Sequence, residues 1–153
     1  MNALRRRLLL GGAAAAFALA AGGCASASKV MPKERAAALQ QSAETYRKLI
    51  RWSDFAAASQ YYRHRSGDTP SFDAARFRGF KVSTYDVGDA QMGDDLGQAS
   101  FDAALTFYST DTGRAGALRD VQRWWYDAGS RRWYLESPLP DFPAAVAAEP
   151  LSR

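Results

Sequence analysis

The chain of 153 residues contains a single cysteine and a single histidine, and this scarcity excludes several kinds of site. One cysteine cannot form a disulfide within the chain, and one Cys with one His cannot supply the ligands of a zinc site. The histidine, His64, lies between Arg63 and Arg65, where two cations disfavour its protonated form. We therefore expect a solvated side chain there, not a base or a metal ligand.

Motifs for phosphate binding and for nucleophilic serine chemistry are also absent. No pair of glycines precedes a Lys-Ser or Lys-Thr at the spacing of a phosphate loop, and no Gly-x-Ser-x-Gly turn occurs. One region is rich in carboxylates but lacks the spacing of a calcium loop. Its acidic residues are Asp86, Asp89, Asp94 and Asp95. The sequence therefore predicts no cofactor and no metal.

A hydrophobic run long enough to cross a membrane is missing as well. The apolar stretch at residues 8–21 has 14 residues, whereas a transmembrane helix needs about 20. It ends in Gly22 and Gly23, directly before Cys24. The positive residues that precede it are Arg5, Arg6 and Arg7. A charged start, an apolar stretch and small residues at its end are the three parts of a secretory signal peptide.

The residues around Cys24 resemble those of bacterial lipoprotein precursors. The resemblance implies that residues 1–23 are removed and that Cys24 becomes the new N-terminus, carrying a diacylglyceryl thioether and an N-acyl chain. Two or more acyl chains hold a protein stably on a bilayer, whereas one holds it only reversibly. An Asp after the acylated Cys favours the inner membrane in enteric-type lipoproteins, so Ala25 predicts the outer membrane. We expect a domain tethered to the lipid bilayer of a bacterial envelope and facing the periplasm.

The basic start of the chain leaves the route of export open. Arg5, Arg6 and Arg7 are followed by Leu8 and Leu9, which resembles a twin-arginine signal but serves an ordinary signal peptide equally well. The whole chain has 20 basic and 16 acidic residues, and removal of residues 1–23 takes away three arginines and no acid. The mature protein keeps 17 basic and 16 acidic residues, a net charge of +1. Nucleic acid is therefore not an expected partner.

The first half of the mature chain has a helical pattern. Residues 24–32 are small and polar, which favours a flexible tether. Pro32 suits a first helical turn, and apolar residues then recur three or four apart, which predicts an amphipathic helix of about 18 residues. These apolar residues are Ala36, Leu39, Ala43, Tyr46 and Ile50. Ser53 or Asp54 is expected to cap a second helix through about Tyr62, and Ser71 or Asp73 one further turn through Phe77.

From Phe80 onward the apolar period changes to two, which is typical of strands. The clearest strand lies at residues 99–108, where the odd-numbered residues are apolar. Residues 118–126 and 132–136 form an aromatic hairpin around Asp127–Ser130, and residues 81–87 form a fourth strand. Residues 88–97 are a long polar connection. We expect the sheet to end at Pro138 and the Ala-rich tail at residues 143–153 to fray.

Helices followed by about four antiparallel strands predict an α+β fold, a curved meander packed on N-terminal helices as a cone. This order resembles the nuclear transport factor 2-like superfamily and the small proteobacterial lipoproteins that carry it. The resemblance rests on Arg-Trp-Ser-Asp-Phe at residues 51–55 and on the hairpin at residues 122–138, and it covers residues 33–142. The superfamily includes isomerases, hydrolases, dehydratases and many non-catalytic binding domains, so the fold leaves function open.

A catalytic hypothesis follows from the cone, because isomerases of this architecture use a pocket Asp as base and a Tyr or protonated acid as oxyanion donor. The candidate bases are Asp102, Asp86 and Asp120. The candidate donors are Tyr85, Tyr108 and Tyr126. Alternation places Asp102 on the face opposite Phe101 and Phe107, so that an exposed position is favoured over a catalytic one.

The aromatic hairpin is the candidate binding surface. Its residues are Trp124, Trp125, Tyr126, Trp133 and Tyr134. Adjacent Trp124 and Trp125 must point to opposite faces, so that at most one enters the core if the other face is wet. The second face is covered by residues 138–142 or forms an interaction surface, such as a ligand or glycan platform. The sequence thus favours a non-catalytic interaction module, with an apolar-ligand carrier or an Asp/Tyr isomerase- or dehydratase-like enzyme as alternatives.

Overall fold

The computed structural model describes residues 27–148, with side chains from Lys33 onward. Cys24, Ala25 and the arginines of the signal segment lie outside these residues. The helices are α1 (Ala27–Arg51), α2 (Phe55–Ala58), the 3-10 turn η1 (Ser59–Tyr61), α3 (Ala74–Phe77) and α4 (Phe142–Ala148). The strands are β1 (Phe80–Val87), β2 (Gln91–Met92), β3 (Gln98–Ser109), β4 (Ala115–Asp127) and β5 (Arg132–Leu135). Among these helices none is long and apolar enough to span a bilayer.

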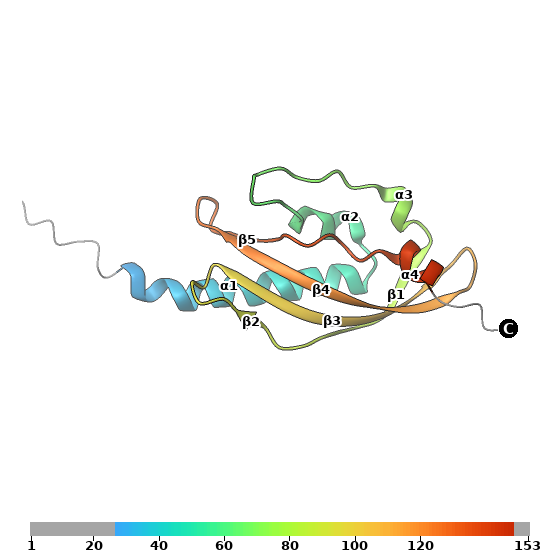
Figure 1. Cartoon of the computed structure of the whole chain (residues 1–153), viewed down its shortest axis with the longest axis horizontal. Coiled ribbons are helices and arrows are strands. Elements are labelled where there is room, and N and C mark those ends of the chain that lie inside the picture. Colours follow the sequence, from blue (N-terminus) through green and yellow to red (C-terminus); the bar gives the residue numbers. More distant parts are fainter. Residues whose placement is uncertain (1–26, 149–153) are drawn as a thin grey trace, which may run out of the picture.

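The expected α+β fold is confirmed. An antiparallel sheet of order β1-β3-β4-β5 curls over α1, and the short β2 pairs with the start of β3 (Figure 1). β3 alternates as its sequence predicts, because every odd residue from Ala99 to Phe107 is buried and faces the helix. β2 interrupts the connection that was expected to lack structure, since Met92 pairs with Ala99.

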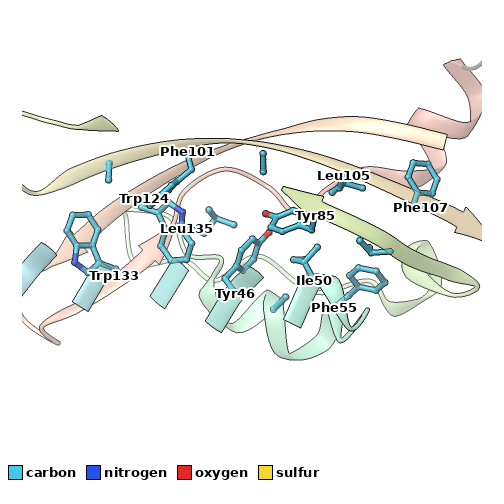
Figure 2. Close-up of a cluster of buried hydrophobic side chains, with 14 of the residues drawn as sticks. Tyr46, Ile50, Phe55, Tyr85, Phe101, Leu105, Phe107, Trp124, Trp133 and Leu135 are labelled. Atoms are coloured by element: carbon cyan, nitrogen blue, oxygen red, sulfur yellow. The ribbon is translucent and has the colours of Figure 1, made fainter. Parts of the chain in front are cut away.

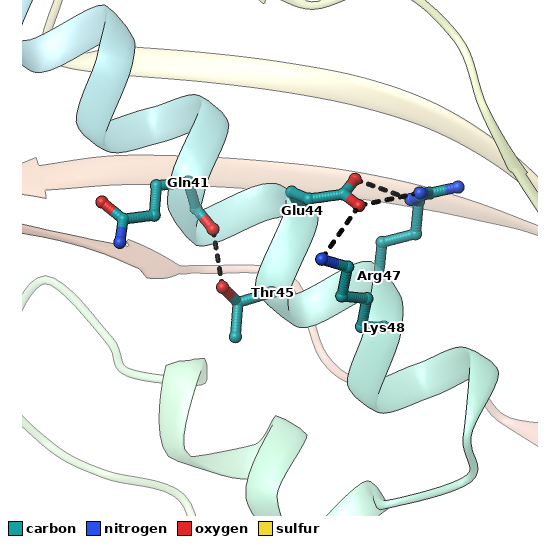
Figure 3. A network of polar contacts seen from close by, with 5 residues as sticks. All are labelled: Gln41, Glu44, Thr45, Arg47 and Lys48. Carbon is teal, nitrogen blue, oxygen red and sulfur yellow. Dashed lines mark hydrogen bonds and ion pairs between the residues drawn. The ribbon is translucent and has the colours of Figure 1, made fainter.

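Helix α1 buries one stripe and exposes the other. Leu39, Tyr46 and Ile50 lie against the sheet, each at most 2% exposed. The opposite face carries solvated ion pairs around Glu44 (Figure 3), which contacts Arg47 at 2.8 Å and Lys48 at 3.6 Å. Exposed pairs of this kind stabilise a helix only slightly. The helix therefore owes its stability to the buried stripe.

The helix begins earlier than the sequence predicted. It starts at Ala27, not Pro32, so the tether assigned to residues 24–32 is wrong for residues 27–32. Pro32 removes one backbone hydrogen bond near the helix start, and the preceding residues, good helix formers among them, sustain the earlier turn. At the other end Asp54 caps α2 as expected, its Oδ1 accepting from the Ala57 N–H at 3.1 Å.

The C-terminal segment also differs from its prediction. Residues 143–148 belong to α4, whereas the sequence predicted a frayed tail from residue 143. Phe142 anchors this helix, because its fully buried ring lies 5.1 Å from that of Phe55 and 5.0 Å from that of Phe107. A large aromatic side chain in the core thus orders an Ala-rich segment that carries little tertiary signal of its own.

Candidate functional site

Two of the candidate carboxylates lie on the outer, solvent face of the sheet. Asp102 accepts both hydrogen bonds of a two-pronged ion pair from Arg119, at 2.7 and 2.8 Å, which lowers the pKa of this carboxyl. Asp86 is exposed on the same face, and so is Tyr108, which is 42% exposed. They therefore lie apart from the space between sheet and helix, and the expected exposure of Asp102 is confirmed.

The third candidate, Asp120, points inward. It is 5% exposed, and its Oδ2 accepts from the Tyr85 hydroxyl at 2.9 Å and from the Gln122 amide at 3.0 Å. The same Gln122 amide also donates to the Tyr85 oxygen. Trp124 continues the chain, its indole N–H donating to the Gln122 carbonyl oxygen at 3.0 Å. β4 thus presents alternate residues 120, 122 and 124 to the interior as one connected network.

Burial decides the electrostatics of this network. It raises the pKa of Asp120, although the hydrogen bonds from Tyr85 and Gln122 act in the opposite direction. Burial likewise raises the pKa of Tyr85 and of Tyr46, and the nearby Asp120 charge adds to both effects. A carboxyl that is held toward its neutral form beside a phenol has the chemical features of an acid–base pair.

Access to this pair is closed by aromatic side chains. Tyr46 reaches from α1 toward Tyr85 (Figure 2), and its hydroxyl is buried without a hydrogen-bond partner among the described residues. Trp124 packs edge-on against Tyr46 at 5.6 Å and against Tyr61 at 5.8 Å. Asp120 and Tyr85 line none of the three main hollows in the part of the chain that the structure describes. The inner end of the cone is a filled core.

Hollows occur at the surface of the domain instead. One groove of about 180 Å³ runs between the segments 70–77 and 138–143. Its walls include Phe72, Phe77 and Leu139 and the side chains of four prolines, and Arg76 pairs with Asp141 at its rim at 2.7 Å. The prolines are Pro70, Pro138, Pro140 and Pro143. Because proline lacks an N–H, this wall offers few donors and suits an apolar group.

The aromatic hairpin divides between the two faces as expected. Trp124 and Trp133 are buried at 1% and 2% exposure, whereas Trp125 and Tyr134 lie on the outer face, half-buried, with ring centroids 5.5 Å apart. Tyr126 lies between Trp133 and the guanidinium of Arg35, 4.6 Å from its ring.

The segment that covers the outer aromatics is not the expected one. The indole of Trp125 donates to the Arg63 carbonyl at 2.8 Å, and the Arg63 guanidinium lies 5.1 Å from the Tyr134 ring. The sequence assigned this cover to residues 138–142, but Phe142 enters the core at the other end of the sheet. Parallel pairing of Tyr62 with Leu135 brings the Arg63 segment beside β5.

Sequence reasoning missed Tyr46 and Gln122 as members of the buried network. Tyr46 was expected only as part of an apolar stripe, and Gln122 was not singled out. The spacing of Asp120, Gln122 and Trp124 could have revealed the network, because residues two apart in a strand share a face and Trp124 favours the inside. His64 is exposed, as expected, and no group of three or more His, Cys, Asp or Glu side chains among the described residues could hold a metal ion.

Comparison with known proteins assigns no family to the chain. No family model matches it, and no curated protein is significantly similar in sequence. The resemblances to bacterial lipoproteins and to the nuclear transport factor 2-like superfamily therefore depend on the residues quoted above and, for the second, on the curled sheet packed over α1.

Proposed function

We propose that this chain is a lipid-anchored protein of a bacterial envelope whose folded domain is a non-catalytic interaction module. The anchor part of the proposal is supported by the basic start, the apolar stretch and Cys24 in the sequence. Because α1 begins at Ala27, Ala25 and Ser26 alone separate the acylated cysteine from the helix. The domain is thus held close to the bilayer surface. Ala25 after the acylated cysteine favours the outer membrane.

The filled cone carries the interaction part of the proposal. A ligand carrier needs an apolar pocket of roughly 300–1,000 Å³. The space between sheet and helix is instead occupied by Tyr46, Trp124, Leu135 and their neighbours, all nearly inaccessible to solvent. Binding then falls to the surface, where the groove of about 180 Å³ between residues 70–77 and 138–143 accepts one apolar side chain of a partner protein.

Site-specific photo-crosslinking in cells tests the groove. Ser71 lines the groove and is exposed, so a photoreactive amino acid placed there faces its contents. Ala37, exposed on α1, is the matched control. We expect a discrete crosslinked band from position 71 and none from position 37. Equal labelling at both positions, or none at either, would contradict the groove as a binding site.

The anchor is tested separately by Cys24→Ser. Metabolic labelling with a fatty acid should mark the natural chain and not this variant, and globomycin should block processing of the natural chain alone. Fractionation should recover the natural protein with the outer membrane. Recovery of labelled protein in the inner-membrane fraction would contradict the outer-membrane assignment, and unlabelled natural protein would contradict lipidation.

A second candidate function is supported by the Asp120–Tyr85 pair, which has the chemistry of an isomerase- or dehydratase-like site. A substrate can reach this pair only if the packing of Tyr46 against Trp124 opens. The Trp124 indole N–H, bonded to Gln122, is an NMR probe of this region. Under the interaction proposal a panel of cyclic ketones leaves that signal unshifted. A shift that Asp120→Asn abolishes would favour the enzyme, and a shift that this variant retains would favour the apolar-ligand carrier.

A further inference from the structure

At one end of the outer face of the sheet, a row of aromatic residues lies beside a row of polar residues. Trp125 and Tyr134 are partners in the β4–β5 ladder and form the aromatic row. Ser100 and Arg123, partners in the β3–β4 ladder, form the polar row, which Glu136 completes through its N–H to the Arg123 carbonyl at 2.7 Å. Both rows lie toward the β4–β5 hairpin, because Arg123 and Trp125 are close to the end of β4. Helix α4 lies at the other end of the sheet (Figure 1).

The polar row opens into a hollow of about 350 Å³. Its polar side chains come from five segments, and they are Arg65, Gln91 on β2, Gln98 and Ser100 on β3, Arg123 on β4 and Glu136 after β5. The Arg65 guanidinium holds Glu136 at 2.9 Å across one side. The side chains of Gln91, Gln98, Ser100 and Arg123 form no hydrogen bond or ion pair with any other residue that the structure describes. Donors and acceptors therefore converge on the hollow with their bonding capacity free for a ligand.

The aromatic row beside the hollow is held in place before any ligand arrives. Trp125, the ladder partner of Gln98, cannot rotate freely because its N–H is bonded to the Arg63 carbonyl at 2.8 Å. The Arg63 guanidinium packs over Tyr134 at 5.1 Å. A fixed aromatic surface loses little conformational entropy on binding, which favours affinity.

We propose that this end of the outer face binds a neutral saccharide of a few pyranose rings. A pyranose has one face of C–H groups, which packs on an aromatic ring, and a rim of hydroxyls, each both donor and acceptor. The Tyr134 ring is already packed against Arg63, so the ring of Trp125, the ladder partner of Gln98 at the edge of the hollow, matches the first. The amides, hydroxyl and guanidinium of the hollow match the second. A hollow of 350 Å³ lies within the roughly 300–1,000 Å³ range of small-ligand sites.

The charge of the hollow favours a neutral ligand over an anion. Arg65 is already paired with Glu136, whose carboxylate repels a phosphate, and Arg123 is left as the single unpaired cation. The side-chain NH2 groups of Gln91 and Gln98 can donate to a phosphate, but their carbonyl oxygens find few donors on it, whereas sugar hydroxyls both donate and accept. The site is separate from the groove at residues 70–77 and 138–143 and requires no lipid on Cys24.

Calorimetric titration of the mature domain with three neutral trisaccharides tests the proposal. The probes are cellotriose, maltotriose and tri-N-acetylchitotriose, with inorganic phosphate as the anionic control. We expect one trisaccharide to bind with a Kd on the order of 1 mM. Because a hydrogen bond contributes about 0.5–1.5 kcal/mol, Arg123→Ala and Gln98→Ala should each weaken binding about 3- to 10-fold.

The controls are chosen to separate site loss from misfolding. Arg78→Ala and Gln60→Ala remove the same side-chain types from exposed positions outside the hollow and should leave the Kd unchanged. Trp125→Phe keeps an aromatic ring and should retain measurable binding, whereas Trp125→Ala should not. Absence of binding by all three sugars, phosphate binding in their place, or equal effects of site and control variants would overturn the proposal. None of these outcomes bears on the groove or on lipidation.

Discussion

The pKa of an aspartate shifts in opposite directions on the inner and the outer face of the sheet. Asp102 on β3 and Asp120 on β4 are offset by one position, since Asp120 is the partner of Ala103 in the ladder. The ion pair with Arg119 lowers the pKa of Asp102, whereas burial raises that of Asp120. Residue type and neighbourhood in sequence therefore say little about the charge state of an aspartate in this sheet. The face on which it lies determines it.

The same contrast divides the two adjacent tryptophans. Trp124 is 1% exposed and is surrounded by Tyr46, Tyr61 and Gln122, so its whole indole contributes to the core. Trp125 is half-buried and is held mainly by the Arg63 carbonyl and the Tyr134 ring. The inner face supplies stability, and the outer face presents surface that a partner or ligand can contact.

Trp124→Ala and Trp125→Ala give the largest test of this division. Removal of a buried tryptophan leaves a cavity and should lower the free energy of unfolding by about 3–5 kcal/mol. Removal of Trp125 costs one net hydrogen bond and partial burial, about 1–2 kcal/mol. Urea denaturation of the two variants beside the natural domain measures both. Equal losses would show that the outer aromatic row is part of the core.

Asp120 provides the next test, of intermediate size. Asp120→Ala leaves the Tyr85 hydroxyl and the Gln122 amide without their buried acceptor, which should cost about 1–3 kcal/mol. Asp120→Asn keeps an oxygen to accept these bonds and carries no charge, so at pH 7 it should be at least as stable as the natural domain. Thermal denaturation of the pair separates loss of the bond from loss of the charge.

The stability of the natural domain should depend on pH in a direction that the raised pKa of Asp120 determines. Folding raises the pKa of Asp120, so between the unfolded and the folded pKa the folded state holds a proton that the unfolded chain has released. The stabilisation is complete below the unfolded pKa and is lost as pH rises through the folded pKa. We expect the natural domain to lose stability over that interval and Asp120→Asn to lose less. Identical profiles would mean that Asp120 is ionised and solvated in the folded domain.

The sequence predicted the orientation of β3 better than that of β4. β3 has a uniform apolar set, so its facing, and with it the exposure of Asp102, followed directly from alternation. β4 has no such set: its inner residues include Asp120 and Gln122, whereas Val121 lies outside at 45% exposure. Alternation alone could not orient that strand. Asp120 was consequently one of several candidate bases, and its contact with Tyr85 depends on the β1–β3–β4 order.

The predictions for α4 and for the cover of Trp125 were wrong because both features depend on contacts between residues that are distant in sequence. α4 is short and rich in alanine, and Phe142 holds it through Phe55 and Phe107, which are far away in sequence. The cover of Trp125 likewise depends on a single bridge between Tyr62 and Leu135. Composition and periodicity report local preference and do not contain such pairings. The Asp54 cap was predictable because it involves residues three apart.

The smallest expected effect belongs to Asp102 and Arg119 on the outer face. Their side chains are 49% and 71% exposed, so water and salt screen the attraction, and geometry alone does not make the pair stabilising. The lowered pKa of Asp102 means that any contribution is present above the unfolded pKa and is lost as pH falls through the folded one. Asp102→Asn should therefore be at most slightly less stable than the natural domain at pH 7, and the two should have equal stability in acid, where the natural domain has lost the pair. A loss at pH 7 as large as that of Asp120→Ala would contradict the contrast between a buried inner face and a solvated outer face.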